Sequence, residues 1–190
     1  MKYCFILSII LLACSNEQTG VDLYPDMKVR VTNLVETLRD RPITLEKIGT
    51  MDGEMDTTIV TDLDSAQWSR ELQLFSSANF NKSIYRDLYQ LEDRPDKSSN
   101  LTVRTYTYVG EKKVPVEWME IRFLDDPDNW HNIKLKYRES NTGFMAHRDL
   151  EMNFEDVRGN YRIRNYSIRG YQKIIGQDTV KFSIIGTVKY

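Results

Sequence analysis

The sequence predicts an α+β protein in which a curved antiparallel β-sheet of about six to eight strands packs against an N-terminal helix and a second short helix. Two amphipathic helical stretches precede residue 80, and period-two alternation between short turns dominates from residue 101 onward. Consecutive strands joined by tight turns form an antiparallel meander, whose apolar face the two helices can cover. A closed, lipocalin-like barrel is the alternative, but it leaves the opening helix without a place.

The first helix is expected over residues 25–40. Pro25 suits the first position of a helix, and Pro42 would stop it. Apolar residues between the two prolines recur at helical spacing and form one stripe: Met27, Val31, Leu34, Val35 and Leu38. The stripe is too short and irregular for a coiled coil, so it favours packing against a sheet.

A hairpin and the second helix follow. Asp52-Gly53 is a strong hairpin signal and predicts two short strands, over residues 43–50 and 55–61. Asp64, with a glutamine three residues later, resembles a capping box. It predicts a helix over residues 64–78.

The remainder is expected to be mainly strands. Residues 79–93 fit neither period and are interpreted as an extended strand, whereas polar residues 92–100, which include Pro95, are expected to form a loop. Six further strands are predicted over residues 101–109, 114–124, 132–138, 144–154, 161–168 and 179–188.

The N-terminus has the organisation of an export signal. Lys2 precedes an uncharged apolar run over residues 3–12, which is too short to span a bilayer because a spanning helix needs about 20 apolar residues. The alternative is a buried helix followed by an ordinary thiol. Leu11-Leu12-Ala13-Cys14 resembles the lipobox of bacterial lipoproteins. That resemblance implies cleavage between Ala13 and Cys14, and lipid on Cys14.

The lipobox resemblance divides the chain into a signal peptide at 1–13, a flexible tether at 14–22 and a single globular domain at 23–190. Two or more acyl chains hold a protein stably at a membrane, because each buried CH₂ contributes about 0.8 kcal/mol. Cys4 would leave with the signal, so the mature chain could form no internal disulfide. In the bacteria whose lipoproteins this sequence resembles, a dense acidic run after the lipidated cysteine accompanies display on the cell surface. The tail after Cys14 lacks such a run, so the resemblance implies an outer-membrane anchor facing the periplasm.

Charge is unevenly distributed, although the net charge is only −2 and makes no case for a nucleic-acid partner. Residues 52–64 carry five acids and no base, whereas residues 157–190 carry seven bases and one acid. Solvated strand faces and loops explain such runs most simply. The alternative is a basic face that meets anionic lipid or an acidic partner.

The residues that usually carry chemistry form no recognisable constellation. His131 and His147 stand alone in or beside predicted strands, and neither a G-x-S-x-G elbow nor a phosphate-binding loop occurs. Asp52, Glu54 and Asp56 have the spacing of an EF-hand, but the glycine and the twelfth-position glutamate of that loop are missing. We therefore expect no catalytic residues, no cofactor and no metal.

Two further groups of residues have side chains that could form a binding site. Asp125, Asp126 and Asp128 could bind calcium weakly, but a turn explains them better. Four aromatic residues in or beside the central strands could stack on carbohydrate or line an apolar pocket: Tyr106, Tyr108, Trp118 and Trp130. Core packing uses such residues equally well and is the favoured interpretation.

Two stretches beyond the lipobox, Trp68–Leu72 and Phe80–Asp87, resemble envelope lipoproteins of Bacteroidota-type bacteria, a group without assigned catalytic residues. The expected function is a non-catalytic structural or protein-interaction module, attached to membrane lipid through acylated Cys14 and open to an envelope protein partner. The alternative is a carrier of an apolar, lipid-like ligand between sheet and helices, since the layout also looks broadly like that of periplasmic lipoprotein carriers.

Overall fold

The computed structural model describes residues 24–39, 41–85, 87–157 and 160–190, so the predicted signal peptide and the whole predicted tether, including Cys14, lie outside the described residues. The helical elements are α1 (Met27–Leu38), α2 (Ser65–Glu71), α3 (Gln73–Ser77) and the 3₁₀ turn η1 (Ser83–Tyr85). The strands are β1 (Thr44–Met51), β2 (Glu54–Thr61), β3 (Tyr89–Pro95), β4 (Thr102–Tyr108), β5 (Val116–Phe123), β6 (Trp130–Ser140), β7 (Phe144–Val157), β8 (Asn160–Ile174) and β9 (Val180–Lys189).

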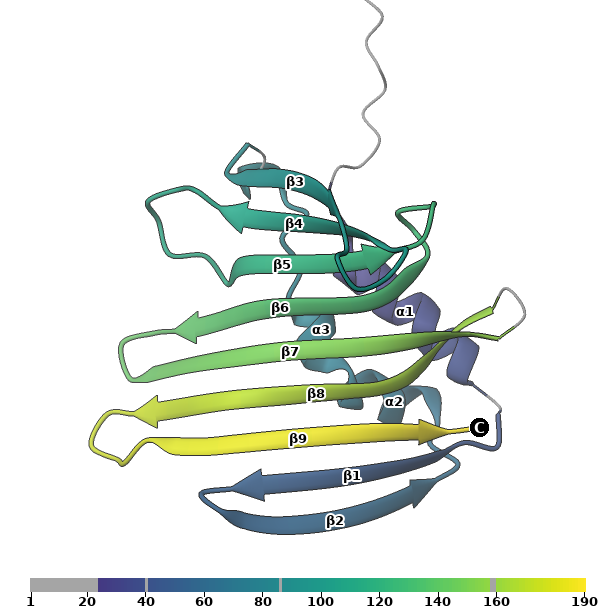
Figure 1. Ribbon diagram of the computed structural model, residues 1–190. Coiled ribbons are helices and arrows are strands. Elements are labelled where there is room, and N and C mark those ends of the chain that lie inside the picture. The colour runs from purple at the N-terminus through teal and green to yellow at the C-terminus, as the bar shows by residue number, and fades with distance from the viewer. Residues whose placement is uncertain (1–23, 40, 86, 158–159) are drawn as a thin grey trace, which may run out of the picture.

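All strands of the described chain belong to one antiparallel sheet with the order β2-β1-β9-β8-β7-β6-β5-β4-β3. The meander runs in order from β3 to β9, and β9 then pairs with β1, which joins the N-terminal hairpin to the C-terminal strand. α1, α2 and α3 lie on one side of the sheet (Figure 1). The predicted α+β class is confirmed, but the strands described number nine instead of six to eight. The sheet is open at β2 and β3, so the alternative of a closed barrel is wrong.

α1 begins two residues later than the position of Pro25 suggested, because Asp26 is the N-cap. The Asp26 carboxylate accepts hydrogen bonds from the backbone N–H groups of Lys28 and Val29, both at 3.0 Å. These bonds satisfy donors that a helix N-terminus otherwise leaves unpaired. The predicted apolar stripe is buried as expected.

The capping box at Asp64 is present, but the predicted second helix is divided. The Asp64 carboxylate accepts from Gln67 N, and the Gln67 side chain accepts from Asp64 N, both at 2.7 Å. Leu72 then interrupts the helix between α2 and α3, while Trp68 and Phe75 on either side of the break are fully buried. Core packing therefore holds the two short helices against the sheet.

The prediction for residues 79–100 is wrong at both ends. η1 replaces the first half of the expected strand, and β3 runs through Pro95, where a loop was predicted. Proline is tolerated because β3 is an edge strand. Asp96 N donates to Leu101 O at 2.9 Å, so antiparallel alternation directs the neighbouring Pro95 nitrogen away from β4, where no donor is required.

The sheet has a helix face and an outer face, and alternation assigns residues to each. The core fills the helix face with the fully buried side chains of the strands and helices: Leu45, Trp68, Leu72, Phe75, Met119, Ile133, Leu135 and Tyr166. A register shift between Val116 and Trp118 changes the phase of β5, so Val116 joins the core although Trp118, two residues later, lies on the outer face.

Candidate functional site: an apolar cavity beneath the first helix

A cavity of about 160 Å³ lies between α1 and strands β6, β7 and β8. Apolar side chains make up most of its wall: Met27, Val31 and Leu34 from α1, and Trp130, Ile133, Met152 and Phe154 from the sheet. The helix contributes one edge of its stripe because residues at i, i+4 and i+7 lie on the same side. The space between helix and sheet is thus incompletely filled along one side of α1.

Arg30 stands at the edge of the cavity. Its Nη1 donates to the backbone oxygen of Asp128 at 3.0 Å, and its Nη2 pairs with the Asp128 carboxylate. The guanidinium carbon also lies 4.6 Å from the centre of the Trp130 ring, within cation–π range. Arg30 therefore connects α1 to the turn between β5 and β6.

That turn presents the partner of Arg30 in a fixed position. Asp126 accepts a hydrogen bond from Asp128 N at 2.9 Å, and Trp130 Nε1 donates to Pro127 O at 2.8 Å. Asp125 adopts a positive φ of 57°, which a short polar side chain tolerates. The three aspartates that could have bound calcium are therefore organised as a turn, and the carboxylate of Asp128 pairs with Arg30.

A groove of about 550 Å³ adjoins the cavity and shares four residues with it: Arg30, Asn33, Asp128 and Trp130. Tyr24, Tyr106, Arg104 and Phe123 line its far side. Because the two hollows meet at Arg30, the Arg30–Asp128 ion pair lies between the apolar cavity and the more open groove.

Arg104 is fixed in the groove by Asp93 of β3. Arg104 Nε and Nη2 donate to the two carboxylate oxygens of Asp93 at 2.8 and 2.6 Å. This bidentate contact lowers the pKa of Asp93 and raises that of Arg104. The guanidinium also faces the Phe123 ring at 5.4 Å.

The end of the cavity near β8 contains an aromatic pair that includes one of the histidines singled out in the sequence. His131 packs edge-on against Tyr161 with ring centres 5.2 Å apart, and its Nε2 is buried without a hydrogen-bond partner in the described structure. Burial raises the pKa of Tyr161, with smaller contributions from nearby carboxylates. His147 instead stacks on Tyr171, with ring centres 4.9 Å apart. The two histidines therefore pack against different tyrosines and do not form one site.

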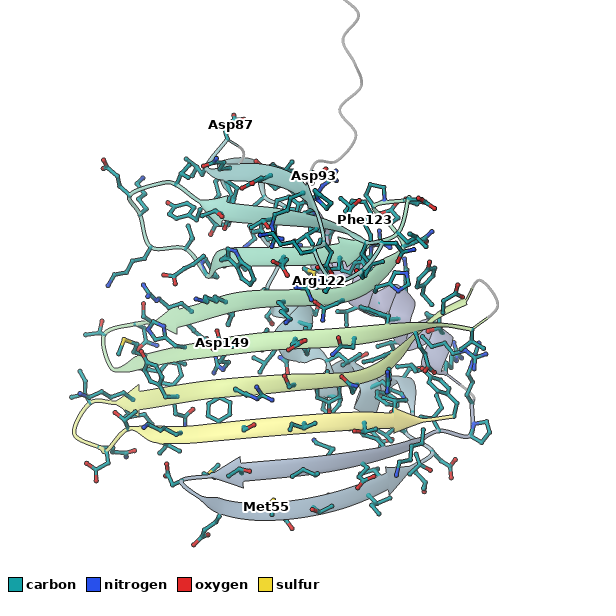
Figure 2. The ribbon with its side chains drawn as sticks, viewed as in Figure 1. Met55, Asp87, Asp93, Arg122, Phe123 and Asp149 are labelled. Atoms are coloured by element: carbon teal, nitrogen blue, oxygen red, sulfur yellow. The ribbon has the colours of Figure 1, made fainter. Side chains whose placement is uncertain are left out.

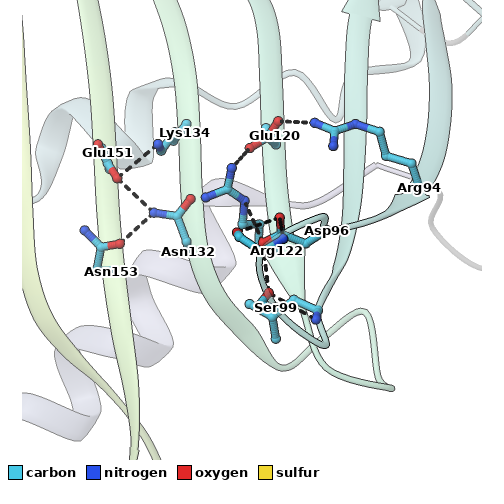
Figure 3. Close-up of polar contacts among 11 residues, drawn as sticks. Arg94, Asp96, Ser99, Glu120, Arg122, Asn132, Lys134, Glu151 and Asn153 are labelled. Atoms are coloured by element: carbon cyan, nitrogen blue, oxygen red, sulfur yellow. Dashed lines mark hydrogen bonds and ion pairs between the residues drawn. The ribbon is translucent and has the colours of Figure 1, made fainter.

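The outer face of the sheet carries a different arrangement, in which charges pair across strands (Figure 3). Glu120 is only 6% exposed and accepts from Arg94 at 3.2 Å and Arg122 at 3.0 Å. Asn132, equally buried, donates to Asn153 at 2.7 Å and to Glu151 at 3.1 Å. The Arg94–Glu120 contact joins β3 to β5 across β4, and the contacts of Asn132 join β6 to β7.

The structure separates the other residues that the sequence singled out. Tyr106 and Trp130 are buried as favoured, Tyr108 packs against the core, and Trp118 is partly exposed on the outer face. Ala13 and Cys14 lie outside the described residues. Among the described residues, no three His, Cys, Asp or Glu side chains gather in a way that could hold a metal ion.

No family model, curated protein or solved structure matches the chain. Within the part of the chain that the structure describes, every helix falls short of the length or apolarity required to cross a membrane.

Proposed function

We propose that this protein is a membrane-anchored lipoprotein that binds an apolar ligand beneath α1. The apolar cavity between α1 and the sheet is the observation that carries the proposal. An apolar cavity of about 150 Å³ can stay dry and bind a molecule the size of benzene. A cavity of about 160 Å³ therefore suits an aromatic ring or a short segment of an acyl chain.

The adjoining groove supports a ligand that is longer than the cavity. A chain that entered past Arg30 would leave its remainder along the groove, where Tyr24 is partly exposed and offers aromatic contact surface, with the almost fully buried Tyr106 and Phe123 behind it. The walls combine apolar contacts with an ion pair at the mouth, which is the chemistry of binding sites. We accordingly propose a binding protein and not an enzyme, with no resident cofactor.

The position of Tyr24 supports a link between this site and the proposed anchor. Tyr24 is the first described residue and lines the groove. A tether that joins Cys14 to Tyr24 would connect to the domain beside the opening, so membrane lipid would be near the site. The proposed location is the outer membrane, with the domain facing the periplasm.

The binding proposal is tested with a matched pair of substitutions on α1. Val31 lines the cavity, whereas Thr32 on the same helix is exposed and lines neither the cavity nor the groove. In the full chain carrying Cys14→Ala, Val31→Phe should fill the cavity and weaken binding of the fluorescent apolar probe N-phenylnaphthylamine by about ten-fold or more. Thr32→Phe should leave binding unchanged. Equal affinities in both variants, or no binding by the parent, would contradict the proposal.

The anchor is tested separately by fractionation. Cys14→Ala should release the chain from the membrane fraction or leave it unprocessed, because acyl chains supply the attachment. Unchanged fractionation with the membrane would rule out the lipoprotein interpretation while leaving the cavity result intact.

A second candidate function is the protein-interaction module that the sequence favoured over a ligand carrier. The free edge of β2 is the observation that favours it, and the two functions are compatible because that edge lies far along the sheet order from β6.

A further inference from the structure

β2 forms one end of the sheet, and within the described chain it pairs with β1 alone (Figure 1). Met55 marks this end in the view with side chains (Figure 2). The outer row of backbone N–H and C=O groups on such a strand is available for pairing with another chain.

The hairpin turn determines which backbone groups of β2 point outward. Asp52 and Gly53 both have positive φ, at 49° and 96°, and Met51 pairs with Glu54 across this two-residue turn. The flanking pair of such a turn is hydrogen-bonded, and every second pair after it is too. Asp62 N donates to Ile43 O at 3.2 Å, in agreement with this phase. The N–H and C=O groups directed away from β1 are therefore those of Met55, Thr57, Ile59 and Thr61. The Thr57 N–H donates to the carboxylate of its neighbour Asp56 at 2.8 Å, and an added strand would replace this exposed local contact.

The side chains at these outward positions are uncharged and share the outer face. The register places Met55 opposite Thr50, and Ile59 opposite Glu46, whereas Lys47 in the alternate set contacts Glu71 of α2 on the helix face. Met55 is 73% exposed and Ile59 is 66% exposed. The free edge therefore presents four β-compatible residues with two exposed apolar side chains.

The opposite edge of the sheet has the features that discourage strand addition. β3 contains Pro95, which has no N–H, and its Asp93 carries a charge tied to Arg104. Proline and charged residues at an edge are common protection against edge-to-edge pairing. The outward positions of β2 have neither feature.

Charge around β2 selects the kind of partner. Residues 52–64 contain five acids and no base, and Glu54 and Asp56 project on the helix face between the outward positions. A second copy paired antiparallel about Thr58 would bring Glu54 opposite Asp62 twice, and like charges directly opposite each other are destabilising. A strand with basic residues at these positions would be attracted instead.

We propose that β2 binds an extended segment of another protein by strand addition, and that this segment alternates apolar or β-branched residues with Lys or Arg. Its apolar residues lie on the outer face beside Ile59, while its basic residues lie opposite Glu54 and Asp56. Main-chain hydrogen bonds to Met55, Thr57, Ile59 and Thr61 supply affinity, and the alternating charges supply specificity.

The test uses two synthetic peptides with the full chain carrying Cys14→Ala. One peptide alternates Val or Ile with Lys, and the other replaces each Lys with Glu. Hydrogen exchange at individual amides should slow at Met55, Thr57, Ile59 and Thr61 when the Lys peptide is added. Its dissociation constant should be lower than that of the Glu peptide by about ten-fold or more and should rise with salt.

Two proline substitutions provide the matched control. Thr57→Pro removes an outward N–H from β2 without removing a bond to β1, and should abolish binding of the Lys peptide. Leu91→Pro removes the equivalent outward N–H from β3 and should change nothing, provided that both variants retain the parent near-ultraviolet circular dichroism. Equal affinity of the two peptides, binding by Thr57→Pro like that of the parent, or self-association of the chain through β2 would overturn the proposal.

Discussion

Gly186 of β9 lies directly opposite Tyr166 of β8, and the Tyr166 ring occupies the space in which a side chain at position 186 would stand. The Tyr166 hydroxyl donates to the Glu71 carboxylate of α2, which also pairs with Lys47 of β1 at 2.8 Å. A glycine in one strand thus lets an aromatic residue of the next strand connect the sheet to a helix.

Replacing Gly186 with alanine should destabilise the fold by about 1–3 kcal/mol, as overpacking of a filled core does. A Cβ at this position would lie 2.2 Å from the Tyr166 ring, closer than atoms can approach. Gly49→Ala is the matched control, because a Cβ there meets nothing within 4 Å. Urea denaturation of both variants measures the difference, and equal midpoints would contradict the argument.

The sequence predicted the elements whose signals are local. The stripe from Met27 to Leu38, the turn at Asp52-Gly53 and the cap at Asp64 each depend on a few neighbouring residues, and all are present in the structure. The loop predicted around Pro95 is wrong because an edge strand such as β3 can accommodate a proline. Whether a strand lies at an edge is a property of the whole sheet and not of its local sequence.

The sequence allowed a ligand between sheet and helices as an alternative, but it could not locate the cavity, for a similar reason. Its lining residues read as ordinary core in a pattern analysis, and only packing decides whether apolar side chains meet or leave a space. Arg30 occupies a position that looks solvent-facing, yet it sits one residue before Val31 and next in space to Trp130. The aromatic residue was noticed in the sequence, but its arginine partner 100 residues away in the chain was not.

The Arg30–Asp128 ion pair should have a larger effect on ligand entry into the cavity than on the stability of the fold. Arg30 and Asp128 are 34% and 77% exposed at their side chains, and exposed ion pairs contribute about 0–1 kcal/mol. Arg30→Met should therefore shift the urea midpoint little but accelerate entry of N-phenylnaphthylamine several-fold in stopped-flow mixing. Lys28→Met, on the exposed side of α1, is the control. An unchanged entry rate in Arg30→Met would show that the pair is not a barrier.

Acid should weaken the fold partly through Asp93. Its pKa is lowered in the folded chain because Arg104 donates to the carboxylate, so the pair contributes fully above the ordinary value of 3.8 and is lost as pH falls through the lowered value. Asp93→Asn should reduce stability at pH 7 and flatten its dependence on pH below that value. Arg104→Gln should flatten it in the same way, since Asp93 would lose the donor. A steep acid transition retained in both variants would contradict this assignment.

Alkali should weaken the fold through tyrosines whose hydroxyl groups are shielded from solvent. Tyr190 is the most tractable, because its residue is 43% exposed while its hydroxyl is hydrogen-bonded. Its hydroxyl donates to Ile163 O at 3.0 Å, and burial raises its pKa from 10.0 to about 12. Between these values the unfolded chain releases a proton that the folded chain retains, so stability falls as pH rises. Tyr190→Phe removes this titration while keeping the ring beside Arg162. Chemical denaturation from pH 9 to 12, a range set about the ordinary tyrosine value of 10, should show a shallower decline for Tyr190→Phe than for the parent, because the buried tyrosines Tyr89 and Tyr166 still titrate in both. Identical declines would mean that the Tyr190 hydroxyl is equally exposed in the two states.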